Sequence, residues 1–92
     1  MIKLVQLTAN AKRDLEKLPS HIIVKLMAWI DDIENRGLDE VRKIPGYHDE
    51  PLKGKRKGEH SVRLSKSYRA IYKIKKLKND FVSVGEVSKH EY

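Results

Sequence analysis

The hydrophobic period changes from helical to strand-like in the second half of the chain, and this change restricts the possible folds more than any other sequence feature. Between residues 20 and 37, apolar residues recur three or four positions apart, which is the spacing of one helix face. After Gly58, apolar residues alternate with polar ones, as in a half-buried strand. Because helical patterns come first and strand patterns follow, we predict an α+β domain with its helices packed on one face of a sheet.

The N-terminal half is predicted to form one strand and two antiparallel helices. Residues 2–7 indicate a short strand, and Thr8 is a suitable N-cap for a first helix of about ten residues that Pro19 stops. Ser20 is the expected N-cap of a second helix, which ends near Gly37. The short link around Pro19 makes the two helices antiparallel. The apolar stripe of the second helix is expected to consist of Ile22, Ile23, Leu26, Met27, Ile30 and Ile33.

The C-terminal half is predicted to form an antiparallel three-strand meander. Residues 38–44 favour one or two further helical turns, and an extended loop follows through Pro51. Strands are expected at 60–65, 70–74 and 81–87, with turns at 66–67 and 76–80. No linker or repeat divides the 92 residues, so we predict a single domain, 1–92, with one small core. The sheet face away from the helices, or its rim, is the expected working surface.

Positive charge is concentrated in one stretch of the chain. Between Lys53 and Lys78 there are eleven basic residues and a single acid, Glu59, whereas both flanking segments are slightly acidic. The net charge of +7 is therefore a local feature of the meander and of the loop that leads into it. Such a basic surface usually meets a polyanion, and nucleic acid is the commonest one.

Composition also restricts the compartment and the cofactors. The chain has no cysteine, which excludes disulfides and thiolate metal sites. The spacings of the four histidines fit no standard zinc pattern, and we expect neither a metal nor another cofactor. No signal peptide is recognisable, and no apolar run approaches the roughly 20 residues that span a bilayer. We expect a cytoplasmic protein with no membrane partner.

Two groups of cations are candidates for phosphate binding. The loop that carries Lys53, Lys55, Arg56 and Lys57 does not match the nucleotide-binding fingerprint, so it is either a generic basic turn or a set of contacts along an RNA backbone. Arg63 and Arg69 flank a short turn between two predicted strands, where their guanidinium groups can converge on one phosphate. The alternative for either arginine is exposure to solvent or an ion pair with Glu59 or Glu86.

Histidines and tyrosines supply the remaining chemistry. RNA cleavage by attack of a 2′-hydroxyl on the neighbouring phosphate needs a base, an acid and positive charge. His48, His60 and His90 are the candidate acid and base groups, whereas His21 is expected to be a surface residue. The candidates for stacking on a nucleobase are Tyr68, Tyr72 and Tyr92, of which we assign Tyr72 to the core.

The C-terminal half resembles a known family. The chain is similar to the RelE/ParE toxin superfamily, and most closely to its HigB-like branch, in its last 42 residues or so. The strand–helix–helix start agrees with that family in outline. The matching residues are Pro51-Leu52-Lys53-Gly54, Gly58, Ser61-Val62-Arg63-Leu64, Tyr68-Arg69-Ala70-Ile71-Tyr72 and a tail that contains His90 and Tyr92.

The resemblance implies a RelE-like microbial ribonuclease fold and the toxin of a type II toxin–antitoxin system. Such a toxin is a metal-independent endoribonuclease, or mRNA interferase, that cuts translated mRNA in the ribosomal A site. Its implied partners are the ribosome, mRNA and a cognate antitoxin, which we expect to be acidic and to carry a helix-turn-helix.

The same resemblance implies roles for individual residues. Lys53, Arg63 and Arg69 contact RNA phosphate, and His90 with Tyr92 belongs to a C-terminal catalytic group beside Lys89. His48 is a candidate because the family carries a histidine just before Pro-Leu-Lys-Gly, although Asp49 and Glu50 intervene here. His60 stands where the family often has an aromatic ring, so it is either a stacking ring or an additional acid or base.

Two other functions remain open at the sequence level. A ParE-type toxin shares the fold and inhibits DNA gyrase by binding it. A non-catalytic RNA-binding module needs only the basic meander. The combination of clustered cations with histidines favours the nuclease over the gyrase inhibitor.

Overall fold

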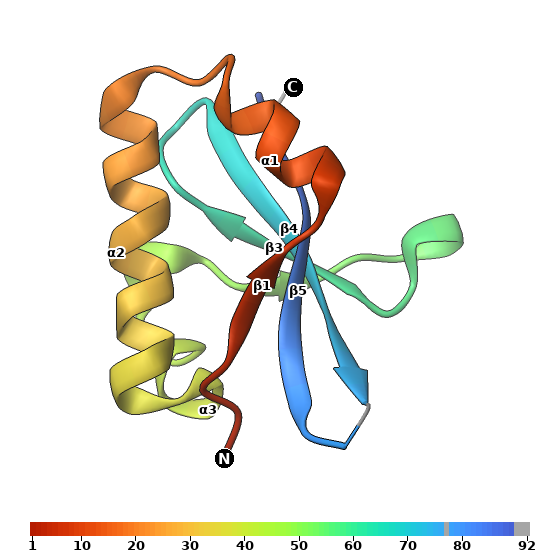
Figure 1. Cartoon of the computed structure of the whole chain (residues 1–92). Helices are drawn as coiled ribbons and strands as arrows, with labels where there is room; N and C mark the ends of the chain where they lie inside the picture. Colours follow the sequence, from red (N-terminus) through yellow and green to blue (C-terminus); the bar gives the residue numbers. More distant parts are fainter. Residues whose placement is uncertain (77, 90–92) are drawn as a thin grey trace.

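The computed structural model describes residues 1–76 and 78–89 of the chain. They form one sheet with helices on a single face (Figure 1). The strand order is β1-β5-β4-β3-β2, in which β3, β4 and β5 form the predicted antiparallel meander. β1 pairs in parallel with β5, and the short β2 adds a further edge beside β3. The predicted α+β architecture is confirmed. The elements are β1 (Val5–Leu7), α1 (Ala9–Leu15), α2 (Ser20–Arg36), α3 (Leu38–Val41), η1 (Pro45–Tyr47), β2 (Glu50–Pro51), η2 (Gly54–Arg56), β3 (Glu59–Arg63), β4 (Tyr68–Lys76) and β5 (Asp80–Lys89).

The helix starts follow partly from the predicted caps. The side chain of Thr8 accepts a hydrogen bond from the Ala11 amide at 3.1 Å, so it caps α1 as expected. Ser20 is not a cap, because α2 begins at this residue. The carbonyl of Pro19 accepts hydrogen bonds from the amides of Ile22 and Ile23 instead. α1 is also shorter than predicted, since the chain tightens into three-residue turns after Leu15.

The core lies between α2 and the inner face of the sheet. Leu26, Ile33, Val62 and Val84 are fully buried there. Met27 was wrongly placed in the apolar stripe, since 45% of it is exposed on the outer face of α2. The stripe instead contains Trp29, which is fully buried and packs against the Tyr72 ring at a centroid distance of 5.5 Å. Burial of Tyr72 confirms its assignment to the core.

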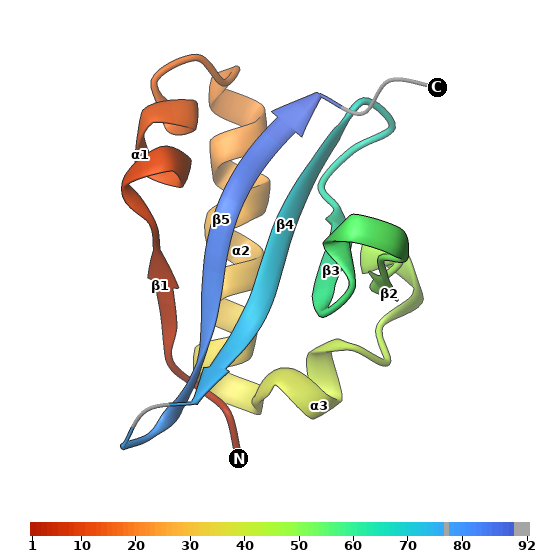
Figure 2. The ribbon, with the colours of Figure 1, turned by 90° about the vertical axis from the view of Figure 1, so that its right-hand side faces the viewer.

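Two segments predicted as loop have local structure. Residues 45–51 contain the 3₁₀ turn η1 and then β2, whose Glu50 and Pro51 pair with Ser61 and His60 of β3. The 3₁₀ turn η2 forms the tip of a protrusion that extends away from the helices (Figures 1 and 2). The predicted strands 2–7 and 60–65 are shorter than expected. Ile2 leaves the sheet because its carbonyl accepts a hydrogen bond from the Leu38 amide, and β3 ends at Arg63, where the chain bends.

Within residues 1–76 and 78–89, no helix is both long and apolar enough to cross a membrane.

Candidate functional site

A small groove at the end of the sheet gathers several residues singled out from the sequence. It lies beside β2, β3 and the start of β4 and has a volume of about 40 Å³. We call it the arginine groove. Its lining residues are His48, Glu50, Ser61, Arg63, Ser65, Tyr68 and Arg69.

Strand register brings the two arginines of this groove together. Arg63 of β3 lies directly opposite Arg69 of β4 in the antiparallel ladder. Their chain neighbours Val62 and Ala70 are fully buried against the helices, so the two arginines point to the other face of the sheet. Like charges placed directly opposite each other destabilise a sheet. An anion between the two guanidinium groups removes that repulsion.

The charges of these two arginines are only partly offset in the described part of the chain, where Glu86 interacts electrostatically with Arg69. Among the described residues, no ion pair involves Arg63 or Arg69, and Arg69 Nε is buried without a hydrogen-bond partner. A buried donor without an acceptor costs free energy of folding, about 1–3 kcal/mol for a typical group. Such groups in a native structure are often functional. The arginine groove is therefore suited to binding an anion.

β2 and the turn before it bring a carboxylate and a histidine to the same groove. His48 is exposed, with left-handed backbone geometry (φ 49°), and its amide donates to the Pro45 carbonyl at 3.1 Å. Glu50 is exposed on β2 and pairs with Ser61. Glu50 was not among the predicted site residues, because its strand has only two residues and was predicted as loop. Pro51 was interpreted as part of a loop, whereas it lies in the edge strand β2, where a proline is tolerated.

His60 does not reach the arginine groove. It follows the alternation of β3 to the inner face, where its ring stacks on Tyr72 with a centroid distance of 5.1 Å. Its Nδ1 lies 3.3 Å from Asp49 Oδ1 and its Nε2 lies 3.3 Å from an Arg42 Nη. Both ring nitrogens are thus engaged away from Arg63 and Arg69. The position offers neither a free stacking face toward the groove nor a free acid or base there.

Arg42, Asp49, His60 and Tyr72 form a connected cluster, which we call the Asp49 network. The Tyr72 hydroxyl donates to Asp49 Oδ2 at 2.5 Å and accepts from Arg42 Nε at 3.3 Å. Burial, followed by the hydrogen bond to Asp49, raises the pKa of Tyr72 above its ordinary value. The Asp49 side chain is only 5% exposed. The network therefore holds its charges in place instead of presenting them to solvent.

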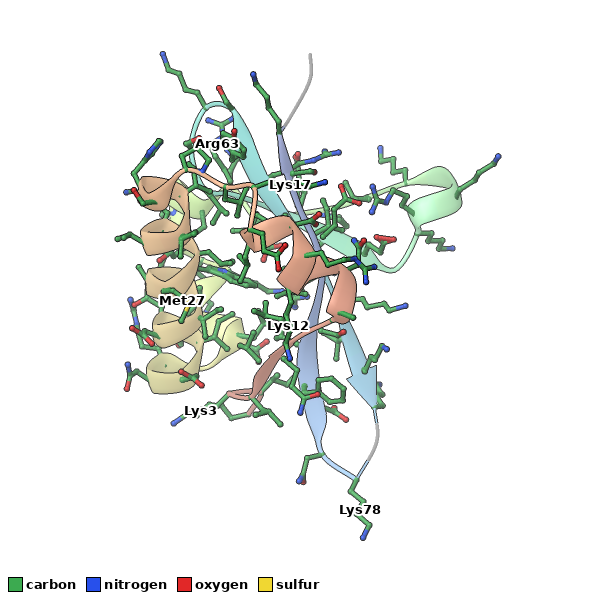
Figure 3. All side chains as sticks on the ribbon, turned by 45° about the horizontal axis from the view of Figure 1, so that its top comes forward. Lys3, Lys12, Lys17, Met27, Arg63 and Lys78 are labelled. Atoms are coloured by element: carbon green, nitrogen blue, oxygen red, sulfur yellow. The ribbon has the colours of Figure 1, made fainter. Side chains whose placement is uncertain are left out.

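The basic stretch does not form one continuous surface. Figure 3 places Arg63 at one end of the sheet and Lys78, in the β4–β5 hairpin, at the opposite end. Lys53, Lys55 and Lys57 are exposed in and beside η2. Arg56 differs from these lysines, because its guanidinium lies 3.1 Å from Glu59 and 3.0 Å from Glu86. The ion pairs expected as alternatives for Arg63 and Arg69 are made by Arg56.

The C-terminal candidates cannot all be placed. Lys89 is exposed at the end of β5 and pairs with Tyr68, a half-buried residue that also lines the arginine groove. The described chain therefore ends beside this groove. His90 and Tyr92 lie outside the described residues. Within the described ranges, no group of three or more histidines and carboxylates is arranged to hold a metal ion.

Comparison with known proteins gives matches in structure but not in sequence. No protein-family model and no curated protein matches the chain. A YoeB/ParE toxin from Agrobacterium tumefaciens superposes with a TM-score of 0.71 at 19% identity, covering 96% of this chain and 99% of that one. YafQ from E. coli gives 0.74 at 17% identity, with 94% and 91% coverage. The toxin–antitoxin complex RelBE2 from Mycobacterium tuberculosis gives 0.68 at 24% identity, with 98% and 100% coverage.

The chain has the fold of the RelE/ParE toxins. The match extends over nearly the full length of both chains, so it includes the N-terminal strand and helices as well as the meander. The fold resemblance expected from residues 51–72 and the C-terminal tail is thereby confirmed for the whole domain.

Proposed function

We propose that the protein is the toxin of a type II toxin–antitoxin system and that it cleaves translated mRNA in the ribosomal A site. The observation that carries this proposal is that Arg63 and Arg69 lie opposite each other beside His48 in the arginine groove, with no ion pair to either among the described residues. A gyrase-binding toxin has no need for two such arginines beside a histidine. The toxin fold supports the same conclusion.

The groove supplies a base and the positive charge that the reaction needs. The 2′-oxygen of one nucleotide bonds to the adjacent phosphorus and the 5′-oxygen of the next nucleotide leaves, which gives a 2′,3′-cyclic phosphate and a 5′-hydroxyl. Arg63 and Arg69 stabilise the extra negative charge of the phosphorane. His48 or Glu50 accepts the proton of the 2′-hydroxyl. These four residues come from β2, β3, β4 and the turn before β2.

The leaving 5′-oxygen requires an acid. We assign this role to His90, which follows Lys89 directly in the sequence. Tyr92 and Tyr68 offer ring faces for the nucleobases on either side of the scissile bond. Lys89 adds positive charge at the same end of the sheet.

The exposed lysines and the partner proteins complete the proposal. Lys53, Lys55 and Lys57 contact ribosomal RNA through the η2 protrusion, which suits contacts beyond the groove. A cognate antitoxin with an acidic segment and a helix-turn-helix domain covers the arginine groove. Both the ribosome and this partner place the protein in the cytoplasm. Its assignment to the HigB-like branch stays a prediction from the sequence.

The test is cleavage of mRNA on programmed ribosomes by the purified protein. Arg63→Ala and His90→Ala should each lower the cleavage rate by about 10²-fold or more, because each removes a group that acts on the transition state. Lys3→Ala is the matched control. It removes one exposed positive charge near the N-terminus, at the opposite end of the molecule from Arg63 (Figure 3), and should cut at the parental rate. Circular dichroism checks that all three variants are folded.

Parental cleavage rates in both Arg63→Ala and His90→Ala would show that the assigned site is wrong. Inhibition of gyrase supercoiling without mRNA cleavage would favour the ParE-type function. Binding of RNA without either activity would favour the non-catalytic module.

A further inference from the structure

Asp49 stands between two groove residues in the sequence, but its side chain points away from the groove. His48 and Glu50, its chain neighbours, both line the arginine groove. The Asp49 carboxylate turns in the opposite direction, toward His60 and Tyr72, and is nearly buried. Asp49 connects the left-handed residue His48 to the strand residue Glu50, so anchoring its carboxylate restrains the backbone that carries both neighbouring side chains.

The hydrogen bonds of the Asp49 network can be satisfied in only one arrangement. Arginine has donors and no acceptor, so His60 Nε2 must accept from Arg42. His60 Nδ1 therefore carries the proton and donates to Asp49 Oδ1. The Tyr72 hydroxyl accepts from Arg42 and donates to Asp49 Oδ2. Both carboxylate oxygens are used as acceptors, and this arrangement requires the Nδ1–H tautomer of His60.

The segment around Asp49 also has a strained backbone that needs support. His48 has left-handed φ of 49°, which costs a non-glycine residue about 1–2 kcal/mol. On its N-terminal side, the Tyr47 hydroxyl donates to Asp32 Oδ2 of α2 at 2.5 Å. On its C-terminal side, Asp49 is held by the sheet through His60 and Tyr72. Such conformations persist where the surroundings determine them on both sides.

We infer that Asp49 is a positioning residue: through His60 and Tyr72 it fixes His48 and Glu50 against Arg63 and Arg69. This role rests on the proposed function of the arginine groove for its effect on cleavage. Its effect on His48 geometry is independent of that function. His60 accordingly acts through Asp49 and not on RNA.

The decisive substitution is Asp49→Asn, which keeps the shape and replaces one acceptor with a donor. The amide NH₂ then faces either the Nδ1–H of His60 or the hydroxyl of Tyr72, so one donor meets another donor. Neither partner can reverse its role, because Arg42 already donates to both of them. We expect kcat for mRNA cleavage to fall about 10- to 100-fold, because the catalytic side chains are displaced from their reactive positions, while KM changes little. Asp14→Asn is the matched control. Asp14 accepts a backbone hydrogen bond from the Val87 amide at 2.9 Å, which asparagine can also accept.

NMR tests the geometry without RNA. In the parent protein, the ¹⁵N spectrum of the imidazoles should show His60 as the Nδ1–H tautomer. In Asp49→Asn, the His48 imidazole shifts and the His48 coupling constant that reports φ should both change, whereas Asp14→Asn leaves them unchanged. Tyr72→Phe removes one of the two contacts to Asp49 and should give an intermediate change. It replaces Asp49→Asn in these measurements if the latter does not fold.

The outcomes separate this inference from the proposed function. If the parent protein cuts no mRNA but Asp49→Asn shifts His48, the positioning role stands and the nuclease proposal fails. If Asp49→Asn leaves the His48 signals at their parental positions, the inference is overturned, whatever the cleavage result. An Nε2–H tautomer at His60 would overturn it as well, since the arrangement with Arg42 would then be impossible.

Discussion

The arginine groove and the Asp49 network are built from neighbouring residues of the same strands, yet they treat charge in opposite ways. Arg63 faces outward with no ion pair among the described residues, whereas Arg42, from α3's C-terminal end, donates to both Tyr72 and His60. His48 is exposed in the groove, whereas both nitrogens of His60 are engaged in the network. Residue type alone therefore does not identify a functional group. Unsatisfied charge marks the groove, and complete hydrogen bonding marks the network as a support.

Arg56 sharpens the same comparison on the outer face of the sheet. It belongs to the basic stretch as Arg63 and Arg69 do, but two carboxylates neutralise it. A ligand phosphate has to compete with Glu59 and Glu86 for this guanidinium. We therefore assign Arg56 to anchoring the η2 protrusion and leave RNA contacts to the lysines around it.

The largest expected effect comes from replacing Arg69 by alanine, with the same replacement of Arg56 as the comparison. Arg69→Ala should lower kcat for mRNA cleavage by about 10²- to 10³-fold, because an unpaired cation is lost from the transition state. Arg56→Ala should leave kcat close to the parental value. Single-turnover cleavage on programmed ribosomes measures both. Equal losses in the two variants would erase the distinction between free and neutralised arginines.

A pair of tyrosines tests the two regions through stability. Tyr72→Phe should lower the free energy of unfolding by about 1–3 kcal/mol, because an oxygen of the nearly buried Asp49 loses its donor. Tyr68→Phe, in the arginine groove, should change it by less than about 0.5 kcal/mol. Urea unfolding followed by circular dichroism gives both values. A larger loss for Tyr68→Phe would contradict the supporting role of the network.

Alkaline pH should weaken the Asp49 network selectively. The pKa of Tyr72 is raised in the folded protein, so the unfolded chain loses this proton first, near pH 10.0. Stability is fully present below that pH and declines as pH rises above it. Thermal melts between neutral pH and pH 11 should show a smaller decline for Tyr72→Phe. Some decline should remain, because burial and the hydrogen bond to Asp32 raise the pKa of Tyr47 to about 12.

The smallest expected effect concerns the carboxylate partners of Arg56. Hydrogen bonds from Ser88 and Arg56 lower the pKa of Glu86, so its contribution is present above about pH 4.5 and is lost as pH falls through the folded value. Glu86→Gln should cost about 0.5–1 kcal/mol at pH 7. The difference from the parent should shrink at pH 3. Glu40→Gln, from the exposed Lys43–Glu40 pair, is a control in which no measurable change is expected.

The sequence predicted the elements better than their ends. Periodicity located α2 and the three meander strands because the same apolar residues that define the pattern also form the core. The ends were set by contacts that no local pattern contains. Ile2 leaves the sheet to bind the Leu38 amide, and Pro19 instead of Ser20 precedes α2. β2 was missed because two residues cannot display a period.

The candidate site was predictable only in part, for a related reason. The spacing of Arg63 and Arg69 around a short turn indicated that the two residues are adjacent. This could be predicted because the length of the turn sets the register of the two strands. Nothing local distinguishes Arg56 from them, or His60 from His48. The acidic partners of Arg56 are Glu59 of β3 and Glu86 of β5, and Glu86 lies 30 residues further along the chain than Arg56.

By itself, the sequence determined the fold class, the concentration of positive charge between Lys53 and Lys78 and the arginine pair, because hydrophobic period, charge and turn spacing are local properties of the chain. Only the tertiary structure decided which charges are free and which are neutralised. It turned Asp49 and His60 inward and left His48, Glu50, Arg63 and Arg69 in one groove. The physical reason is that a charge is satisfied or left available by partners that the fold brings from distant segments.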